Sequence, residues 1–287
     1  MQQENSASRA VVFLGGGRIT SALCAGLRLA GYSREIVVYD RNPAKLRALK
    51  KESRIAIASD LHSAVERAGM LILAVRPASV PDLLDRVTDA GVWPGLCVSL
   101  AAGIPLTSLR STTGTLVRWV RAMPSPVCRV GRGLTALSFD RAVSRNERSR
   151  VRQFFELVGQ VIELPEARFD AFTATYSSSH GYHAVATLAL AAQRAGLDRT
   201  TALTAAAHAL ADGIQYWRES RRDLDDLLQE AVTPGGIAAA SIAAMEKAGY
   251  RRAVEDGISA GISQAKRNSQ AIAALRASDN SRKRKHK

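Results

Sequence analysis

The chain has 287 residues, of which 46% are hydrophobic and 23% are charged. At about 100–200 residues per domain this length suggests one large or two modest domains, and the apolar content excludes an intrinsically disordered chain. No apolar run approaches the ~18–20 residues of a membrane-spanning helix. The net charge is +14, but five of the last six residues are Lys or Arg. We therefore expect a solvated basic surface, with neither a membrane nor a nucleic-acid partner.

The cysteines indicate a reducing compartment. Cys24, Cys97 and Cys128 are odd in number and are spaced for neither a disulfide framework nor a metal site. The N-terminal segment lacks the apolar core of a secretory signal, so we expect the chain to begin near Met1. A cytoplasmic protein without a metal site fits these features best.

Short apolar runs alternate with helix-length stretches between residues 9 and 165. This alternation is typical of right-handed βαβ units and predicts a doubly wound parallel sheet, that is, a Rossmann domain in an α/β protein. The predicted strands are 10–14, 35–39, 55–58, 70–75, 96–100, 116–120 and 161–164, and the predicted helices are 19–30, 42–49 and 148–158.

Strand-like patterns end at residue 165. Alanine-rich stretches at 184–195 and 201–211 predict helices, and the sequence Thr-Pro-Gly-Gly at 233–236 predicts a loop or a sharp helix start. We expect a dinucleotide-binding domain over 1–165, an all-helical domain over 166–275 and a basic, disordered tail over 276–287.

A glycine cluster follows the first predicted strand. Gly15, Gly17 and Thr20 occupy the marked positions of a G-x-G-x-x-(G/A/T) turn, and Asp40 ends the next strand twenty residues later. The first glycine permits a tight turn, and the second lets backbone N–H groups approach a pyrophosphate. The strand–turn–helix context predicts a dinucleotide site here.

The residues after the second predicted strand leave the coenzyme open. Asp40 could accept hydrogen bonds from the ribose 2′-hydroxyl of NAD, whereas Arg41 and Asn42 could receive the 2′-phosphate of NADP. Alternatively, Asp40 caps the following helix and Arg41 points to water. Either NADPH or NADH fits these residues.

Six segments occur in the order seen in one enzyme family: FLGGGRITSAL, LAVRP, VSLAAG, VRAMPSP, AVTPGG and MEKAGYRRAVEDGI. Over residues 10–268 the chain resembles the pyrroline-5-carboxylate reductases. The resemblance implies NAD(P)H-dependent reduction of the cyclic imine 1-pyrroline-5-carboxylate to L-proline. It also implies a helical dimerisation domain that forms a homodimer or a larger homo-oligomer.

The resemblance implies roles for residues as well. The expected cofactor-binding residues are Leu14, Gly15, Gly16, Gly17, Arg18, Ile19, Ala74, Val75, Arg76, Pro77, Ala101, Ala102 and Gly103. The expected substrate-binding residues are Met123, Pro124, Ser125, Pro234, Gly235, Gly236 and Ala238. Thr233 is an expected catalytic residue, with its hydroxyl near the substrate carboxylate.

The sequence departs from the family on the substrate side. A family threonine hydroxyl near the imine nitrogen is replaced by Ala238, and the segment 176–182 reads YSSSHGY. We hypothesise that His180 or Tyr176 supplies the missing polar contact or proton; alternatively, His180 caps a helix or faces a dimer interface. These changes leave two other functions open: reduction of a different imine or keto acid, or NADP binding without catalysis.

Overall fold

The computed structural model describes residues 9–91, 93–115 and 117–285. The chain forms two compact units. The sheet unit comprises Met1–Tyr176 and Ala260–Lys287, and the helical unit comprises Ser177–Ser259.

The sheet unit is built on eight strands in the order β3-β2-β1-β4-β5-β6-β7-β8. Neighbouring strands are parallel except for β6 and β7, which are antiparallel. This topology confirms the predicted doubly wound sheet, but β7 was not predicted. The strands are β1 Ala10–Leu14, β2 Ile36–Tyr39, β3 Ala56–Ile57, β4 Ala68–Leu73, β5 Leu96–Ser99, β6 Arg118–Met123, β7 Gly133–Phe139 and β8 Gly159–Glu163.

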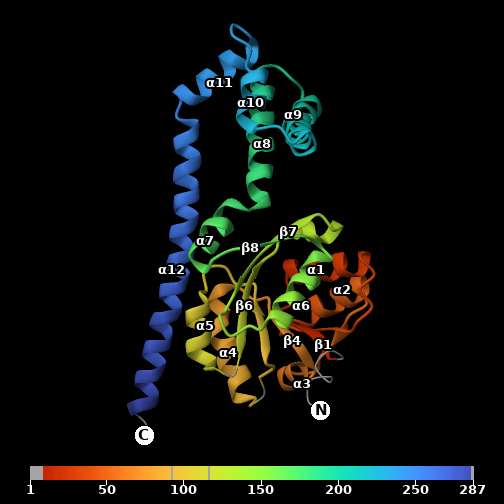
Figure 1. The fold of residues 1–287 in the computed structure, drawn as a ribbon, viewed down its shortest axis with the longest axis vertical. Helices are drawn as coiled ribbons and strands as arrows, with labels where there is room; N and C mark the ends of the chain where they lie inside the picture. The colour runs from red at the N-terminus through yellow and green to blue at the C-terminus, as the bar shows by residue number, and fades with distance from the viewer. Residues whose placement is uncertain (1–8, 92, 116, 286–287) are drawn as a thin grey trace. The chain divides into compact units, whose positions relative to one another are not determined.

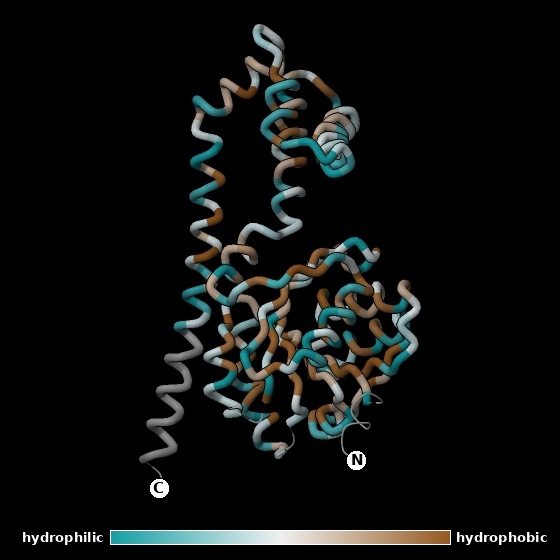
Figure 2. Tube along the Cα trace, in the orientation of Figure 1, coloured by the Kyte–Doolittle hydropathy of each residue, from teal (hydrophilic) through white to brown (hydrophobic). Residues whose placement is uncertain are grey.

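Helices cover both faces of the sheet (Figure 1). Because alternate strand residues point to opposite faces, Val11 and Phe13 pack with α1, α2 and α6, whereas Val12 and Leu14 pack with α3, α4 and α5. The central strands are accordingly the most hydrophobic part of this unit (Figure 2). The elements are α1 Arg18–Leu29, α2 Pro43–Ser53, α3 Leu61–Glu66, η1 Pro77–Ser79, α4 Val80–Asp89, α5 Leu106–Thr113, η2 Pro126–Val130, α6 Arg145–Glu156 and α7 Glu166–Thr175.

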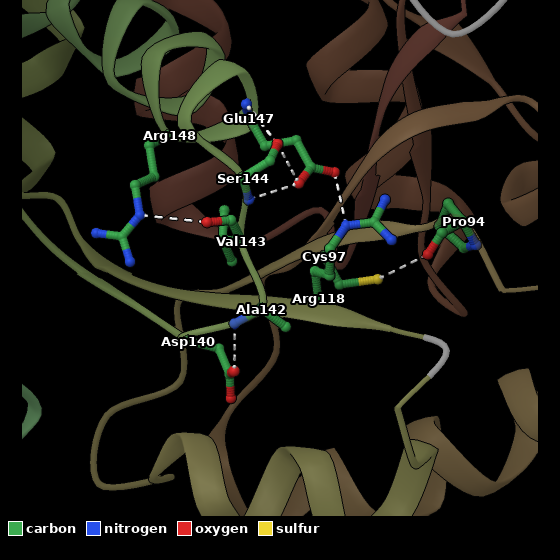
Figure 3. A network of polar contacts seen from close by, with 9 residues as sticks. All are labelled: Pro94, Cys97, Arg118, Asp140, Ala142, Val143, Ser144, Glu147 and Arg148. Carbon is green, nitrogen blue, oxygen red and sulfur yellow. Dashed lines mark hydrogen bonds and ion pairs between the residues drawn. The ribbon is translucent and has the colours of Figure 1, made fainter. Parts of the chain in front are cut away.

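Helix α6 begins with a capping box (Figure 3). The Ser144 hydroxyl accepts a hydrogen bond from the Glu147 amide, and the Glu147 carboxylate accepts one from the Ser144 amide. The same carboxylate accepts a hydrogen bond from Arg118 Nε of β6 at 2.7 Å. These contacts set the helix start three residues before the predicted one and tie α6 to the sheet.

The helical unit contains α8 Ser178–Arg194, α9 Arg199–Ser220, α10 Leu224–Ala231 and α11 Ile237–Lys247, and α12 Tyr250–Lys285 begins in it. Helices α8 and α9 pack through three buried alanines, Ala189, Ala202 and Ala206. The chain turns between α10 and α11 at Thr233–Gly236, which confirms the break predicted there.

The compact units and the last helix do not follow the expected domain limits, which stay predictions. The compact sheet unit includes α7, so the division by compactness falls after Tyr176 and not near residue 165. The backbone of α12 is helical to Lys285, where a disordered tail was expected from residue 276 onward; residues 286 and 287 lie outside the described residues.

Candidate dinucleotide and substrate site

The glycine turn joins β1 to α1. Gly15 has φ +113°, and a Cβ on it would lie 2.5 Å from the carbonyl oxygen of Ala74, at the end of β4. Only glycine combines this conformation with such close backbone packing. A Cβ on Gly17 would meet nothing within 4 Å, so the turn is open at that position, as an approaching pyrophosphate requires.

The N-terminus of α1 is suited to an anion. Its N-cap, Gly17, provides no side-chain hydrogen bond, and the first turn holds no acidic residue. Asn42, Asp60 and Ser144, in contrast, cap α2, α3 and α6 with their side chains. The first N–H groups of α1 and the positive end of its dipole are therefore available to a dinucleotide pyrophosphate, so the turn fits the coenzyme.

Thr20 stabilises the same turn from within. Its side chain is fully buried, and its hydroxyl donates a 2.6 Å hydrogen bond to the carbonyl oxygen of Gly15. The sequence pattern of the turn requires only a small residue at this position. The hydroxyl adds a direct restraint on the first glycine.

The carboxylate of Asp40 is held beside the turn. Its Oδ2 accepts a 2.7 Å hydrogen bond from the amide of Gly16, and its Oδ1 accepts one of 2.8 Å from the amide of Asn42. Asn42, not Asp40, caps α2, by accepting from Ala44 N. Lys45 Nζ lies 3.8 Å from Oδ2 and offsets part of the negative charge. Asp40 thus links the glycine turn to the start of α2.

Arg41 pairs with a different carboxylate. It forms an exposed ion pair with Asp82 of α4, with 3.7 Å between Nη1 and Oδ2. Exposed pairs of this kind contribute only about 0–1 kcal/mol, so the guanidinium can exchange Asp82 for another anion.

A cavity of about 430 Å³ adjoins the glycine turn on the side of α1, α2 and η2. Gly16 and Gly17 form one part of its wall, and the cationic side chains of Arg18, Lys45 and Arg129 form others. One carboxylate, that of Glu52, also lines it and lies 3.9 Å from Arg129. The balance is positive, which raises the local concentration of phosphate-bearing ligands.

The other predicted cofactor and substrate segments of the sheet unit follow strand ends at the same sheet edge. The segments 74–77, 101–103 and 123–125 follow β4, β5 and β6, which run parallel to β1. Open α/β sheets bind ligands at this carboxyl edge. The fold therefore brings these segments to the edge that carries the glycine turn.

Local contacts fix two of these segments. The amide of Ala101 donates to Ser99 Oγ at 3.3 Å, and the hydroxyl of Ser125, which is buried, accepts from the amide of Val127 at 3.2 Å. Gly103 has φ +73°, and a Cβ on it would lie 2.5 Å from the carbonyl oxygen of Ala265 in α12. Gly103 is therefore needed for helix packing, whatever it contacts in the coenzyme.

Tyr176 ends α7, and its hydroxyl oxygen accepts a 2.8 Å hydrogen bond from the amide of Leu134 in β7. The hydroxyl keeps its own proton in this arrangement and can still donate it. A role as proton donor is compatible with this contact.

The remaining predicted site residues lie in the helical unit. His180 is exposed in the first turn of α8. The turn before α11 is closed by a 2.9 Å hydrogen bond from Gly236 N to the Thr233 carbonyl, and Gly235 has φ +77°. Ala238 is exposed near the start of α11. The roles of these residues, together with those of Pro234 and the segments in the sheet unit, stay predictions.

The three cysteines are free, buried thiols. Burial raises the pKa of Cys24 and of Cys128 to about 12 and that of Cys97 well above its ordinary value, so all three stay protonated and unreactive near neutral pH. Within the described ranges, no group of three or more His, Cys, Asp or Glu side chains could hold a metal ion, and no helix is long and apolar enough to cross a bilayer.

A doubly wound sheet with an open glycine turn, an uncapped helix N-terminus and an acidic residue after β2 defines a dinucleotide-binding protein of the Rossmann type. Two family models match the chain. The model described as "NADP oxidoreductase coenzyme F420-dependent" covers residues 10–103, and that described as "Pyrroline-5-carboxylate reductase dimerisation" covers residues 166–268.

The pyrroline-5-carboxylate reductase of Mycobacterium tuberculosis is 31% identical in an alignment that covers 87% of this chain and 93% of that protein. The same enzyme from Mycobacterium leprae is 30% identical with the same coverage. A crystal structure of Plasmodium falciparum pyrroline carboxylate reductase, with NADP bound, superimposes with a TM-score of 0.80 at 21% identity, covering 91% of this chain and 98% of that one. The chain belongs to the pyrroline-5-carboxylate reductase family, as the resemblance predicted.

Proposed function

We propose that this protein reduces 1-pyrroline-5-carboxylate to L-proline with NADPH or NADH. In this reaction a hydride adds to the carbon of the C=N bond, a proton adds to the nitrogen, and the coenzyme leaves oxidised. The observation that carries the proposal is membership in the family together with a glycine turn suited to a dinucleotide.

The nicotinamide supplies the hydride when the coenzyme is bound, so the protein has to bind, orient and protonate. The amides at the start of α1 would hold the pyrophosphate, and Asp40 with Asn42 would face the adenosine ribose. The segments 101–103 and 123–125 would border the nicotinamide and the substrate. The Thr233–Gly236 turn would receive the substrate carboxylate.

Proton supply is where this chain differs from its family. Ala238 carries no hydroxyl, and the proposed replacements are Tyr176 and His180. Tyr176 has the better-defined geometry, because the Leu134 amide fixes its hydroxyl oxygen and leaves the proton to donate. His180 is the other candidate, in the first turn of α8. The missing hydroxyl also favours a second candidate function, reduction of a different cyclic imine or keto acid.

Coenzyme oxidation followed at 340 nm tests the proposal. Purified protein should oxidise NADPH or NADH with 1-pyrroline-5-carboxylate, and proline should appear in equal amount. Parallel reactions with a six-membered cyclic imine carboxylate and with a keto acid test the second function. Turnover with these alone would replace the proposed substrate. Coenzyme binding without turnover of any would indicate a non-catalytic relative.

The His180→Ala variant tests one proton donor. The side chain is exposed, so the substitution should leave the fold intact. If His180 donates the proton, kcat/KM falls at least tenfold and the coenzyme dissociation constant is unchanged. An unchanged kcat/KM assigns His180 to the surface or to an interface.

We further propose that the protein is a homodimer, or a larger homo-oligomer, held by its helical unit. Within that unit only three of the described residues are buried apolar side chains, the alanines between α8 and α9. Large apolar side chains are exposed there instead, among them Tyr182, Ile214, Trp217, Leu224 and Met245. Apolar side chains exposed in this number within one unit are expected where the unit forms an obligate interface. Light scattering on the eluted protein should give at least twice the mass of one chain.

A cytoplasmic location is part of the proposal. Three free buried thiols suit a reducing compartment. Fractionation of cells should recover the protein with cytoplasmic markers.

A further inference from the structure

Arg121 is the most deeply buried charged side chain among the described residues, with 1% of its surface exposed. It lies on β6. Its Nη1 donates to Glu166 Oε1 at 2.9 Å, its Nη2 donates to Asp170 Oδ1 at 2.8 Å, and its Cζ lies 4.3 Å from the ring centre of Phe169. All three partners belong to α7, at positions that share one face of the helix. Arg121 therefore joins the sheet to α7.

Stability alone does not account for this cluster. A buried ion pair often contributes no more than well-packed apolar side chains would. Among the described residues, neither Arg121 Nε nor Glu166 Oε2 has a hydrogen-bond partner, although both atoms are buried. Buried polar atoms in native proteins are usually paired, so stabilisation by this cluster is incomplete and its contacts to other segments have to be considered.

The cluster also holds the loop after β5. Glu166 Oε1, which binds Arg121, accepts a second hydrogen bond of 3.0 Å from the amide of Leu106, the first residue of α5. At the other end of this loop, Ser99 Oγ accepts from the amide of Ala101, and Ser99 is the strand neighbour of Arg121. The loop 101–105 is thus fixed at both ends by Arg121 and its neighbours.

Helix α12 packs on the same region. A Cβ on Gly103 of this loop would lie 2.5 Å from the Ala265 carbonyl, and a Cβ on Gly261 would lie 3.1 Å from Ala174 of α7. The loop, α7 and α12 therefore pack closely, and a displacement of α7 would reach the loop. Arg121 also precedes the predicted substrate segment 123–125 by two residues.

We propose that Arg121 is a positioning residue for hydride transfer. Through Glu166 and Asp170 it fixes α7 and the loop 101–105, and thereby the nicotinamide against the substrate. The proposal rests on the proposed function, because it uses the places assigned there to the nicotinamide and the substrate. Arg121 should not affect the binding of the adenosine half of the coenzyme.

The test compares Arg121→Met and Arg121→Lys with a matched control, Arg67→Gln. Arg67 also pairs with a glutamate, Glu35, but both side chains are about half exposed and neither lies in the proposed site. In Arg121→Met, kcat should fall at least tenfold while the dissociation constant of ADP-ribose, which lacks the nicotinamide, stays within twofold. Arg121→Lys keeps the charge but not the paired geometry, and should recover part of kcat. The control, Arg67→Gln, should match the wild type in kcat and in the dissociation constant of ADP-ribose.

A second readout does not need turnover. The ratio of the NADH to the ADP-ribose dissociation constant should rise at least fivefold in Arg121→Met. If the wild type reduces no imine, the proposed function fails, and this ratio still decides the role of Arg121.

Glu166→Gln is the variant to use if Arg121→Met does not fold, because it keeps an acceptor for Leu106. We expect at least a threefold fall in kcat or rise in the same ratio. The proposal is overturned if folded variants at both positions keep kcat and the ratio within twofold of the wild type, even with a lowered melting temperature. If the Arg121 variants do not fold, the proposal is overturned when Glu166→Gln folds and keeps both kcat and the ratio within twofold of the wild type.

Discussion

Two alanine substitutions in the glycine turn should separate folding from coenzyme binding. Gly15→Ala places a Cβ 2.5 Å from the carbonyl oxygen and 2.9 Å from the carbonyl carbon of Ala74, at a residue with φ +113°. Strain at such a conformation costs about 1–3 kcal/mol, and overpacking against backbone that cannot move aside costs about 1–3 kcal/mol more. We expect the free energy of unfolding to fall by about 2–6 kcal/mol.

Gly17→Ala is the matched variant. Gly17 has φ −81°, which alanine adopts, and its Cβ would contact nothing within 4 Å. Alanine is a somewhat poorer N-cap than glycine, so we expect a stability loss of at most about 1 kcal/mol. The same methyl group would stand where the pyrophosphate approaches the amides of α1. The dissociation constants of NADPH and NADH should therefore rise at least tenfold.

Urea denaturation at one protein concentration gives the stability of both variants, and titration calorimetry gives their coenzyme affinities. If folded Gly17→Ala binds both coenzymes as tightly as the wild type, the pyrophosphate does not bind at this turn. If Gly15→Ala is as stable as Gly17→Ala, the turn does not require glycine at position 15.

Three further substitutions test single contacts. Asp40→Asn removes a negative charge from the predicted ribose site, so the ratio of the NADPH to the NADH dissociation constant should fall about tenfold by calorimetry; an unchanged ratio would place the 2′-position elsewhere. Burial alone would raise the pKa of Glu147, but hydrogen bonds from Ser144 and Arg118 hold this pKa below its ordinary value. The stability that Glu147 contributes is therefore complete above the ordinary pKa of a glutamate and is lost as the pH falls through the lowered pKa. Ser144→Ala should weaken this dependence of the unfolding free energy on pH, measured by urea titration, and should cost about 1 kcal/mol at neutral pH. In Tyr176→Phe, kcat should fall at least tenfold with unchanged coenzyme affinity, and an unchanged kcat would exclude proton donation.

The sheet and its glycine turn were predictable because their signals are local. Buried parallel strands appear as continuous apolar runs, and the turn residues follow the first of these at a fixed spacing. Strand β7 was missed because it lies in an antiparallel pair with β6 after a short connection, whereas only βαβ units were expected. The hydroxyl contact of Thr20 was also missed, since the pattern at that position specifies size and not hydrogen bonding.

Contacts between distant segments left no such signal. Gly103 was assigned to the coenzyme from its motif, and its packing against Ala265 depends on a helix more than 150 residues later in the chain. The boundary after Tyr176 has the same origin, because α7 is held to the sheet by side chains far from it in sequence.

Arg121 shows why a buried charge is hard to find in a single sequence. The strand was predicted over 116–120, which leaves Arg121 outside it, and an arginine in most proteins occupies a solvated position. The structure extends β6 to Met123 and buries Arg121 between Ser99 and Ser138, two small polar residues on neighbouring strands. Its partners Glu166 and Asp170 appear from sequence as ordinary charges of a helix surface. Arg121 belongs to the segment VRAMPSP, but that segment indicates nothing about its partners. The pairing exists only once the sheet brings β6 to the start of α7, so the proposed role of Arg121 is recognisable from its contacts and not from the segment.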